Sequence, residues 1–266
     1  MSADRPVLRH FSGQLLRAVG IPDKTTAVVK KQRWRVGATA VAYFWRFYSV
    51  YSLLDHDPRL IMLVSLFLAG KTEESFVNLA DLQKIYSGFS ESRLLGAEIL
   101  LLEALQFELK VFHPQNLVHA VAAEIKRMAP APSGDVGQVE AEADRARWAE
   151  AVNAWDSRAS AALLQLQEAG GGVGADEGGA PLCPRSVAAG ALRLTEPQGE
   201  GHAALREALT IVLQKRLGAE VAAADCSVLE RVRALLAEAQ TPPDVEALTA
   251  RMREVKAQNR WEKSKK

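Results

Sequence analysis

Three short segments carry residue types that could do chemistry. Asp55-His56-Asp57 joins two carboxylates to an imidazole, and these are side chains that bind divalent metals. They are adjacent, lack a fourth ligand and precede Pro58, so helix capping by Asp57 explains them better than metal binding. The glycine-rich run 170–174 resembles a phosphate loop, but no strand precedes it and no Lys-Ser or Lys-Thr pair follows it. We therefore expect no catalytic residue, no metal and no cofactor.

The bulk composition is close to electrical neutrality. The 266 residues include 33 Lys and Arg against 32 Asp and Glu, which gives a formal net charge of +1. Such a balance argues against direct nucleic-acid binding. Cys183 and Cys226 are too far apart for a disulfide framework or a zinc site, which indicates a reducing compartment. The start has no apolar stretch suited to secretion, and the apolar runs are too short to span a membrane, so we expect a soluble intracellular protein without a membrane partner.

The hydrophobic pattern of the N-terminal half predicts helices and no convincing strand. A polar stretch rich in Lys and Arg, 24–35, separates the first two helices. Asp57 and Pro58 are an N-cap and a first helical residue, and the helix after them is apolar nearly all round, which is typical of a buried central helix. Gly70-Lys71 marks its expected end. The predicted helices are 7–19, 36–51, 58–70, 78–86 and 91–107.

The C-terminal half repeats this organisation more weakly and suggests an internal duplication, without residue identity to prove it. Its predicted helices are 138–168, 184–194, 201–217 and 225–239, and a last helix follows Pro242-Pro243. Prolines and glycines at 129–138 indicate a connector. We therefore predict an N-terminal domain at 1–125, a linker at 126–137, a second domain at 138–241 with a glycine-rich insertion at 170–179, and a C-terminal helix with a basic tail at 242–266.

Three motifs, in order along the chain, resemble the cyclin box. The run GATAVAYFWRFY at 37–48 resembles its second helix, and DPRLIMLVSLFLAGKTEES at 57–75 resembles its third helix and the following turn. The run AEILLLEALQFEL at 97–109 resembles its fifth helix. The residues that match the family pattern are Leu68, Ala69, Lys71, Glu73, Glu74, Glu98, Leu105, Phe107 and Leu109. The resemblance covers residues 7 to about 120.

This resemblance implies an all-α fold of two cyclin-box five-helix bundles in tandem, plus terminal helices. It implies a nuclear, non-enzymatic regulatory subunit that binds and activates a cyclin-dependent protein kinase. By similarity, Lys71 and Glu98 lie side by side and hydrogen-bond main-chain groups around the kinase αC helix. The resemblance also places an apolar floor beneath that helix, formed by Leu68, Leu102, Phe107 and Leu109.

Within the family, the chain is most similar to the cyclin H subfamily, through YFWRFY, HDPRLIM and the FHP that follows the fifth helix. That subfamily implies a kinase of the type that activates cyclin-dependent kinases, a RING-containing assembly subunit and a general transcription factor complex. The implied substrates of the kinase are cyclin-dependent kinase activation loops and the C-terminal domain of RNA polymerase II. Three alternatives stay open, namely a cyclin C-like Mediator kinase subunit, a cyclin-fold transcription factor scaffold and an unrelated enzyme.

The chain departs from the family at two places. Many cell-cycle cyclins have an Asp before Arg-Phe in the second helix, where this chain has Trp45, so their buried ion pair is absent. The glycine-rich insertion is not a family feature. Taken alone, Lys71 is an ordinary helix C-terminal cation and Glu98 a solvated helix residue. Leu102, Phe107 and Leu109 could equally belong to the core.

Overall fold

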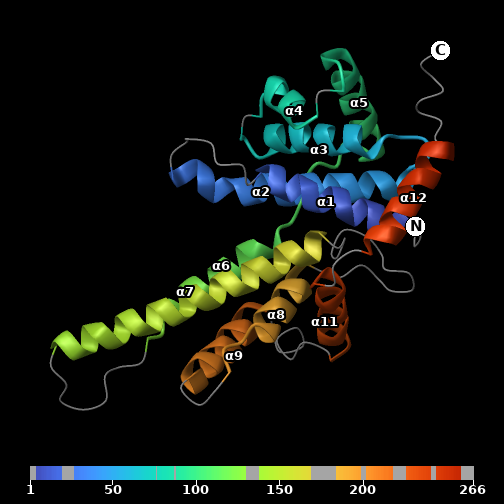
Figure 1. The fold of residues 1–266 in the computed structure, drawn as a ribbon. Coiled ribbons are helices and arrows are strands. Elements are labelled where there is room, and N and C mark those ends of the chain that lie inside the picture. The colour runs from blue at the N-terminus through green and yellow to red at the C-terminus, as the bar shows by residue number, and fades with distance from the viewer. Residues whose placement is uncertain are drawn as a thin grey trace. The chain divides into compact units, whose positions relative to one another are not determined.

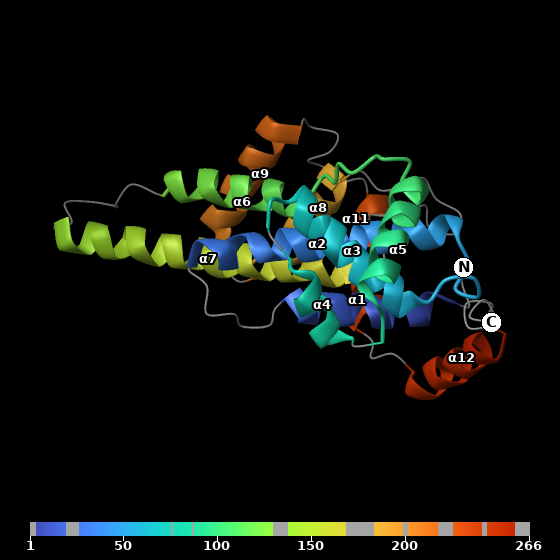
Figure 2. The ribbon, with the colours of Figure 1, turned by 90° about the horizontal axis from the view of Figure 1, so that it is seen from above.

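The computed structural model describes residues 4–19, 27–75, 77–86, 88–129, 138–168, 184–198, 202–217, 226–240 and 244–258. All regular secondary structure within these ranges is α-helical (Figures 1 and 2), which confirms the predicted all-α class. The helices are α1 (Arg5–Val19), α2 (Ala27–Val50), α3 (Pro58–Thr72), α4 (Leu79–Ile85), α5 (Glu91–Ala104), α6 (Pro114–Arg127), α7 (Gln138–Glu168), α8 (Pro184–Leu194), α9 (Ala203–Leu217), α11 (Cys226–Gln240) and α12 (Val245–Gln258). In the described part of the chain, every helix is too short or too polar to cross a lipid bilayer.

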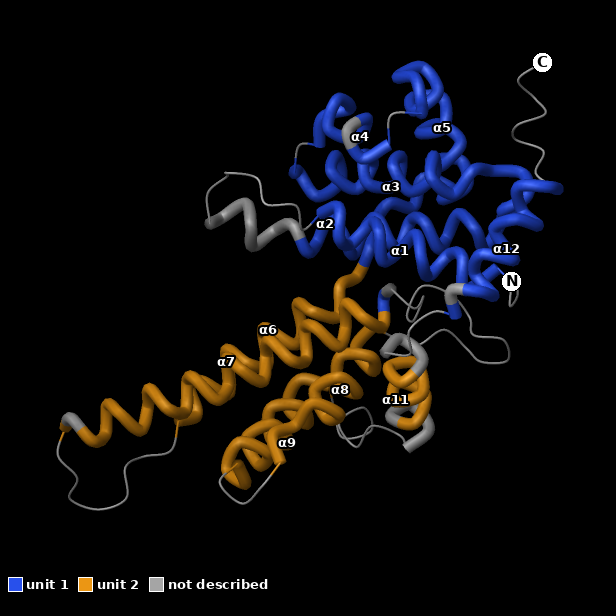
Figure 3. The backbone as a smooth tube through the Cα atoms, in the orientation of Figure 1, with its two compact units in different colours: residues 1–111, 167–181, 239–266 blue, residues 112–166, 182–238 orange. Residues whose placement is uncertain are grey.

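The chain divides into two compact units (Figure 3). Unit 1 comprises residues 1–111, 167–181 and 239–266, and unit 2 comprises 112–166 and 182–238. Unit 1 thus holds α1 to α5 with α12, and unit 2 holds α6 to α9 with α11. The division differs from the predicted boundary at 126–137, because the helix 114–127 belongs to unit 2.

Helix α3 is the central helix of unit 1. It packs against α1, α2 and α5, and nearly every side of it is buried, as its all-round apolar sequence predicts. The largest buried side chains around it come from α2, where Tyr43, Phe44 and Phe47 are all inaccessible to solvent. Helix α12 packs on α1, adds Leu248 to this core and ties Arg251 to Asp4 in an ion pair.

The core of unit 2 gathers around the second half of α7. Trp155 is fully buried and donates its indole N–H to the carbonyl of Leu192 on α8, and Trp148 donates to the carbonyl of Ile125 on α6. Both tryptophans are therefore packing residues. The N-terminal part of α7 lacks such contacts, since every side chain from 142 to 147 is exposed.

Three helix ends differ from the sequence expectation. Helix α2 begins at Ala27 rather than at Val36, because the Lys- and Arg-rich stretch continues the helix. Helix α3 continues through Gly70 to Thr72, and α5 ends at Ala104 rather than at Phe107. Several predicted features lie outside the described residues, among them the glycine-rich insertion 170–179, Cys183, most of the linker and the tail beyond residue 258.

Candidate functional site

The ammonium of Lys71 and the carboxylate of Glu98 form a two-pronged ion pair between α3 and α5. Nζ of Lys71 lies 2.6 Å from Oε1 and 2.9 Å from Oε2 of Glu98. The Lys71 side chain is 51% exposed, whereas that of Glu98 is 11% exposed. The same Nζ lies 4.2 Å from the centre of the Phe67 ring, a cation–π distance. A carboxylate and an ammonium thus lie together on one surface, with the cation on the solvent side.

Helix α3 begins at a cap that the sequence predicts. The Asp57 side chain accepts the backbone N–H of Arg59, and Pro58 occupies the first turn. Asp57 also binds the Arg59 guanidinium, with a shortest distance of 2.6 Å. Asp57 therefore fixes where α3 starts, and through the length of the helix it fixes where Lys71 lies.

The end of α3 is a Schellman turn, after which the chain passes close to Gly70. The N–H of Ser75 donates to the carbonyl of Gly70 and that of Glu74 to the carbonyl of Lys71, while Glu74 takes φ 51°. A Cβ on Gly70 would lie 2.6 Å from the Val77 side chain and 2.8 Å from the Ser75 carbonyl oxygen. Gly70 therefore serves the close approach of the returning chain rather than the stop of the helix.

Helix α5 ends in a turn of the same kind. The N–H of Phe107 donates to the carbonyl of Leu102 and that of Gln106 to the carbonyl of Glu103. Gln106 and Phe107 have φ values of 53° and 58°, in the left-handed region that costs a non-glycine residue roughly 1–2 kcal/mol. Two such residues in succession turn the chain sharply and leave the Phe107 ring 67% exposed.

Helix α2 braces both helix ends. The Tyr43 hydroxyl donates to the carbonyl of Leu109 at 2.6 Å and lies 3.2 Å from the Thr72 hydroxyl. Arg46 donates to the carbonyl of Glu108 at 3.2 Å. Burial raises the pKa of Tyr43, so its hydroxyl stays protonated and can donate at neutral pH. The segment after α5 is therefore held in place by side chains of α2.

The first acidic residue after Lys71, Glu73, contacts α2. Glu73 accepts a 2.7 Å hydrogen bond from the Thr39 hydroxyl, and its other carboxylate oxygen lies 3.2 Å from Nε of Arg35. Glu73 is thus a brace between α2 and α3, whereas Lys71 faces α5. Nothing in the sequence indicated these roles of Tyr43, Arg46 and Thr39, because their hydrogen-bond partners lie on other helices or in the segment after α5.

The structure separates the apolar residues that the resemblance groups together. Leu68 is 3% exposed and lies in the core beneath the ion pair. Leu102 and Leu109 are partly buried against that core, and Phe107 is exposed. Leu68 therefore supports the site from below, and the other three have accessible surface.

Two exposed apolar side chains of α5 were not predicted. Leu95 and Ile99 are 44% and 60% exposed. Together with Glu98 and Leu102 they have the spacing i, i+3, i+4 and i+7, which places all four on neighbouring strips of one helix. The sequence contains one sign of exposed apolar residues, because α5 is apolar around more of its circumference than packing against one core requires. We define the α3–α5 patch as Phe67, Lys71, Leu95, Glu98, Ile99, Leu102 and Phe107.

The α3–α5 patch combines one ion pair with exposed apolar side chains. Trp45, where the sequence lacks the acidic residue, is nearly buried in the unit 1 core, so packing replaces an ion pair there. Groups of His, Cys, Asp or Glu that could hold a metal ion are absent from the described residues. An ammonium can donate hydrogen bonds to main-chain carbonyls, and a carboxylate can accept them from main-chain N–H groups. The pair could therefore bind the unpaired main-chain groups at the end of a helix.

Comparison with known proteins gives a family and a fold. The family "Cyclin, N-terminal domain" matches residues 29–110, a range that contains both Lys71 and Glu98. The chain is 40% identical over 92 residues to cyclin-C1-1 of Arabidopsis thaliana, a match that covers 32% of this chain and 36% of the relative. It is 34% identical over 112 residues to putative cyclin-H of Dictyostelium discoideum, covering 42% and 35%. The chain thus spans about a third of the length of the curated relatives it matches.

A solved structure extends the fold similarity over both units. A chain in the structure of the CAK complex from Chaetomium thermophilum bound to ATP-gamma-S aligns with a TM-score of 0.65 at 19% identity. The alignment covers 97% of this chain and 72% of that chain.

Proposed function

Residues 29–110 of this chain form a cyclin N-terminal domain, and on this premise we propose that the protein is a non-catalytic subunit that activates a cyclin-dependent kinase. The α3–α5 patch is the proposed contact surface. The single observation that carries the proposal is the Lys71–Glu98 pair, bordered by exposed apolar side chains on a surface of packed helices.

The proposed partner element is the αC helix of the kinase. Lys71 donates to main-chain carbonyls at one end of that helix, and Glu98 accepts from main-chain N–H groups nearby. Leu95, Ile99 and Phe107 supply the apolar contact, while Leu68 keeps the surface rigid from beneath. A helix laid on an apolar surface with a few polar anchors is a common mode of recognition.

Activation follows from a difference in affinity between two kinase states. A protein kinase is active when its β3 Lys pairs with its αC Glu and its activation loop is ordered. A subunit that binds αC only in the inward position shifts the equilibrium by its differential affinity for the two states. Moving a kinase from about 1% to 99% active requires roughly 5.5 kcal/mol. At about 25 cal/mol per Å², that amount corresponds to about 220 Å² of apolar surface that is buried against the inward state and stays exposed in the other state.

For the partner we propose a kinase of the type that activates cyclin-dependent kinases, with a RING-containing assembly subunit and a general transcription factor complex. The proposal includes nuclear localisation, and it includes phosphorylation of kinase activation loops and of the RNA polymerase II C-terminal domain by the partner. The similarity to cyclin-H proteins and the fold shared with a chain of a CAK complex support this subtype.

A second subtype has its own support. Relatives named cyclin-C reach 40% and 42% identity over 92 residues, above the 34% and 29% of two relatives named cyclin-H. The second candidate is therefore a cyclin C-like subunit of a Mediator kinase. Both candidates use the α3–α5 patch for the same purpose, and they differ in the kinase that it binds and in the complex that the kinase belongs to.

Affinity purification of the tagged chain followed by mass spectrometry tests the function and separates the subtypes. The first candidate predicts an activating kinase with its RING-containing subunit, and the second predicts a Mediator-type kinase. Recovery of promoter-bound factors without any kinase would instead favour the transcription factor scaffold. Turnover by the purified chain alone would contradict a non-catalytic role.

A further inference from the structure

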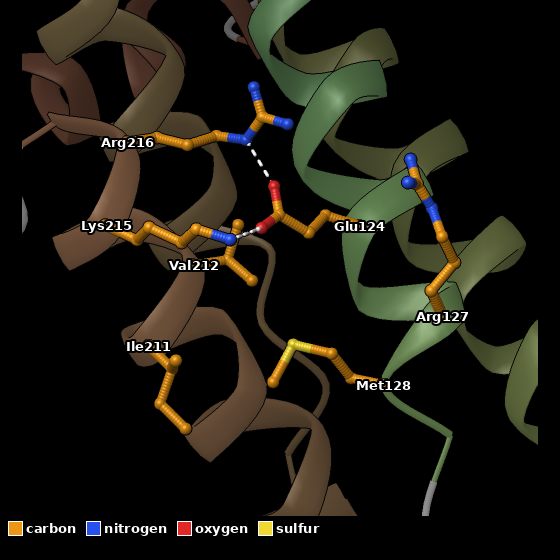
Figure 4. A pocket seen from close by; sticks show the side chains of 7 residues that line it. All are labelled: Glu124, Arg127, Met128, Ile211, Val212, Lys215 and Arg216. Atoms are coloured by element: carbon orange, nitrogen blue, oxygen red, sulfur yellow. Dashed lines mark hydrogen bonds and ion pairs between the residues drawn. The ribbon is translucent and has the colours of Figure 1, made fainter.

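Unit 2 has a groove between α6 and α9 that the proposed kinase contact does not use. The hollow measures about 650 Å³ and is lined by Glu124, Arg127, Met128, Ile211, Val212, Lys215 and Arg216 (Figure 4). Every one of these residues belongs to unit 2. The groove is therefore a separate surface from the α3–α5 patch of unit 1.

The lower part of the groove is apolar. Val212 is buried at its floor, and on either side Met128 and Ile211 are 37% and 47% exposed (Figure 4). A methionine and an isoleucine on facing helices, both accessible above a buried valine, form a receptor for aliphatic or aromatic side chains. The volume is within the range of protein ligand sites and exceeds what one side chain fills.

The rim of the groove is basic. Nζ of Lys215 lies 2.9 Å and Nε of Arg216 lies 2.6 Å from the two carboxylate oxygens of Glu124, which is thereby shared between two cations. These two cations lower the pKa of Glu124, so it is ionised at neutral pH. Arg127 also lines the groove, but it lies across α6 from Glu124 in Figure 4 and donates its Nε–H to the carbonyl of Ala123. The lining residues thus carry three cations and one carboxylate, which leaves two positive charges in excess.

Arg216 retains donors for a second acceptor. It binds Glu124 through Nε, and one of its two terminal nitrogens points away from Glu124 in Figure 4. Lys215 is 73% exposed and has three ammonium hydrogens. Cations in the last turn of a helix also offset the helix dipole, which accounts for their sign. That role does not account for the exposed Met128 and Ile211 beside them.

From this combination we propose that the α6–α9 groove binds an acidic amphipathic helix of a partner protein. One or two large apolar side chains of that helix enter between Met128 and Ile211. Carboxylates that flank them pair with Lys215 and Arg216. The excess of positive charge favours an anionic helix over a neutral or basic one.

The test is a selection from displayed 15-residue helix-forming peptides against the full-length chain. We expect the enriched peptides to be acidic, with apolar residues at i, i+3 and i+4. Fluorescence anisotropy then measures their affinity for the variant Lys215→Glu/Arg216→Glu, which should bind at least about tenfold more weakly. The variant Met128→Ser/Ile211→Ser, changed only at exposed side chains, should lose affinity by a similar factor without changing the net charge.

A matched control separates specific binding from general charge attraction. Arg145 and Arg158 are exposed cations of α7, and Arg145→Glu/Arg158→Glu changes the net charge by the same amount. This control should bind the peptides within about twofold of the original chain at 0.15 M salt. Enrichment without an acidic bias, no enrichment at all, or equal weakening in the control would overturn the proposal. Kinase activation by all three variants should be unchanged, so the outcome is independent of the function proposed for unit 1.

Discussion

Exchanging the two charges of the Lys71–Glu98 pair separates its role in folding from its role in binding. The variant Lys71→Glu/Glu98→Lys keeps an ammonium and a carboxylate within reach of each other, so the ion pair can re-form. Because Lys71 is 51% exposed, the pair contributes at most about 1 kcal/mol to folding. We therefore expect the helical circular-dichroism signal to be unchanged and the free energy of unfolding to fall by no more than that.

The effect on the kinase should be far larger. In the complex the exchanged carboxylate would face main-chain carbonyls and the exchanged ammonium would face N–H groups. Misplaced charges at a desolvated contact cost roughly 2–5 kcal/mol, which is a loss of about 30-fold to about 4,000-fold in affinity. Co-purification of the kinase and its activation should both be lost.

The matched control is the exchange Asp144→Arg/Arg147→Asp, which swaps an exposed ion pair on α7. Both measurements should be unaffected by it. The reasoning is refuted if the Lys71 and Glu98 exchange leaves a folded protein that still activates its kinase fully. It is also refuted if the exchange unfolds unit 1, because the pair would then be a major element of the core.

Three further predictions concern unit 1. Gly70→Ala should lower the free energy of unfolding by about 1–3 kcal/mol in chemical denaturation, because its Cβ would collide with Val77 and with backbone. Phe107→Gly should leave stability within about 1 kcal/mol, since relief of the left-handed backbone offsets the entropy of glycine, while kinase affinity falls at least about tenfold. Burial lowers the pKa of the His56 imidazole, and the negative charge of Asp55 partly offsets this shift. As the pH falls through about 6.5, the folded state therefore binds fewer protons at His56 than the unfolded chain does. Stability should therefore fall as the pH falls through that region in thermal melts, and His56→Gln should flatten the dependence, whereas an unchanged slope would contradict it.

Much of unit 1 could be predicted from the sequence because its signals are local. Asp57 and Pro58 mark the start of α3 through their own chemistry, and the all-round apolar run identifies a buried helix. The proximity of Lys71 and Glu98 is different, since no local rule relates residues on two helices. Only the resemblance to the cyclin box brought them together.

The C-terminal ends of α3 and α5 could not be predicted, because their turns use residues that look helical. Glu74, Gln106 and Phe107 adopt left-handed backbone without being glycine, so nothing in the sequence marked the stops. The one glycine nearby, Gly70, lies inside the helix and suggested a false end. Side-chain and backbone contacts from other helices impose these turns.

Periodicity also fails to say which core a helix joins or which apolar residues stay exposed. Helix α6 has a clear apolar face, yet that face belongs to the unit 2 core through Val118, Val121 and Ile125. In the same way, Leu95 and Ile99 follow the apolar pattern of α5 but lie on its accessible side. Both outcomes are set by the tertiary arrangement rather than by spacing.

The uneven burial of α7 implies a gradient of amide hydrogen exchange along a single helix. From Val152 onward the backbone amides can open only when the unit 2 core opens, so they should exchange as slowly as that unit unfolds. The stretch 142–147 has no such protection, and it can fray one turn at a time at little cost in free energy. Helix α7 would therefore consist of a stable C-terminal part and an N-terminal part that unfolds and refolds independently. A ligand that ordered the N-terminal part would be detected first as slower amide exchange in that part.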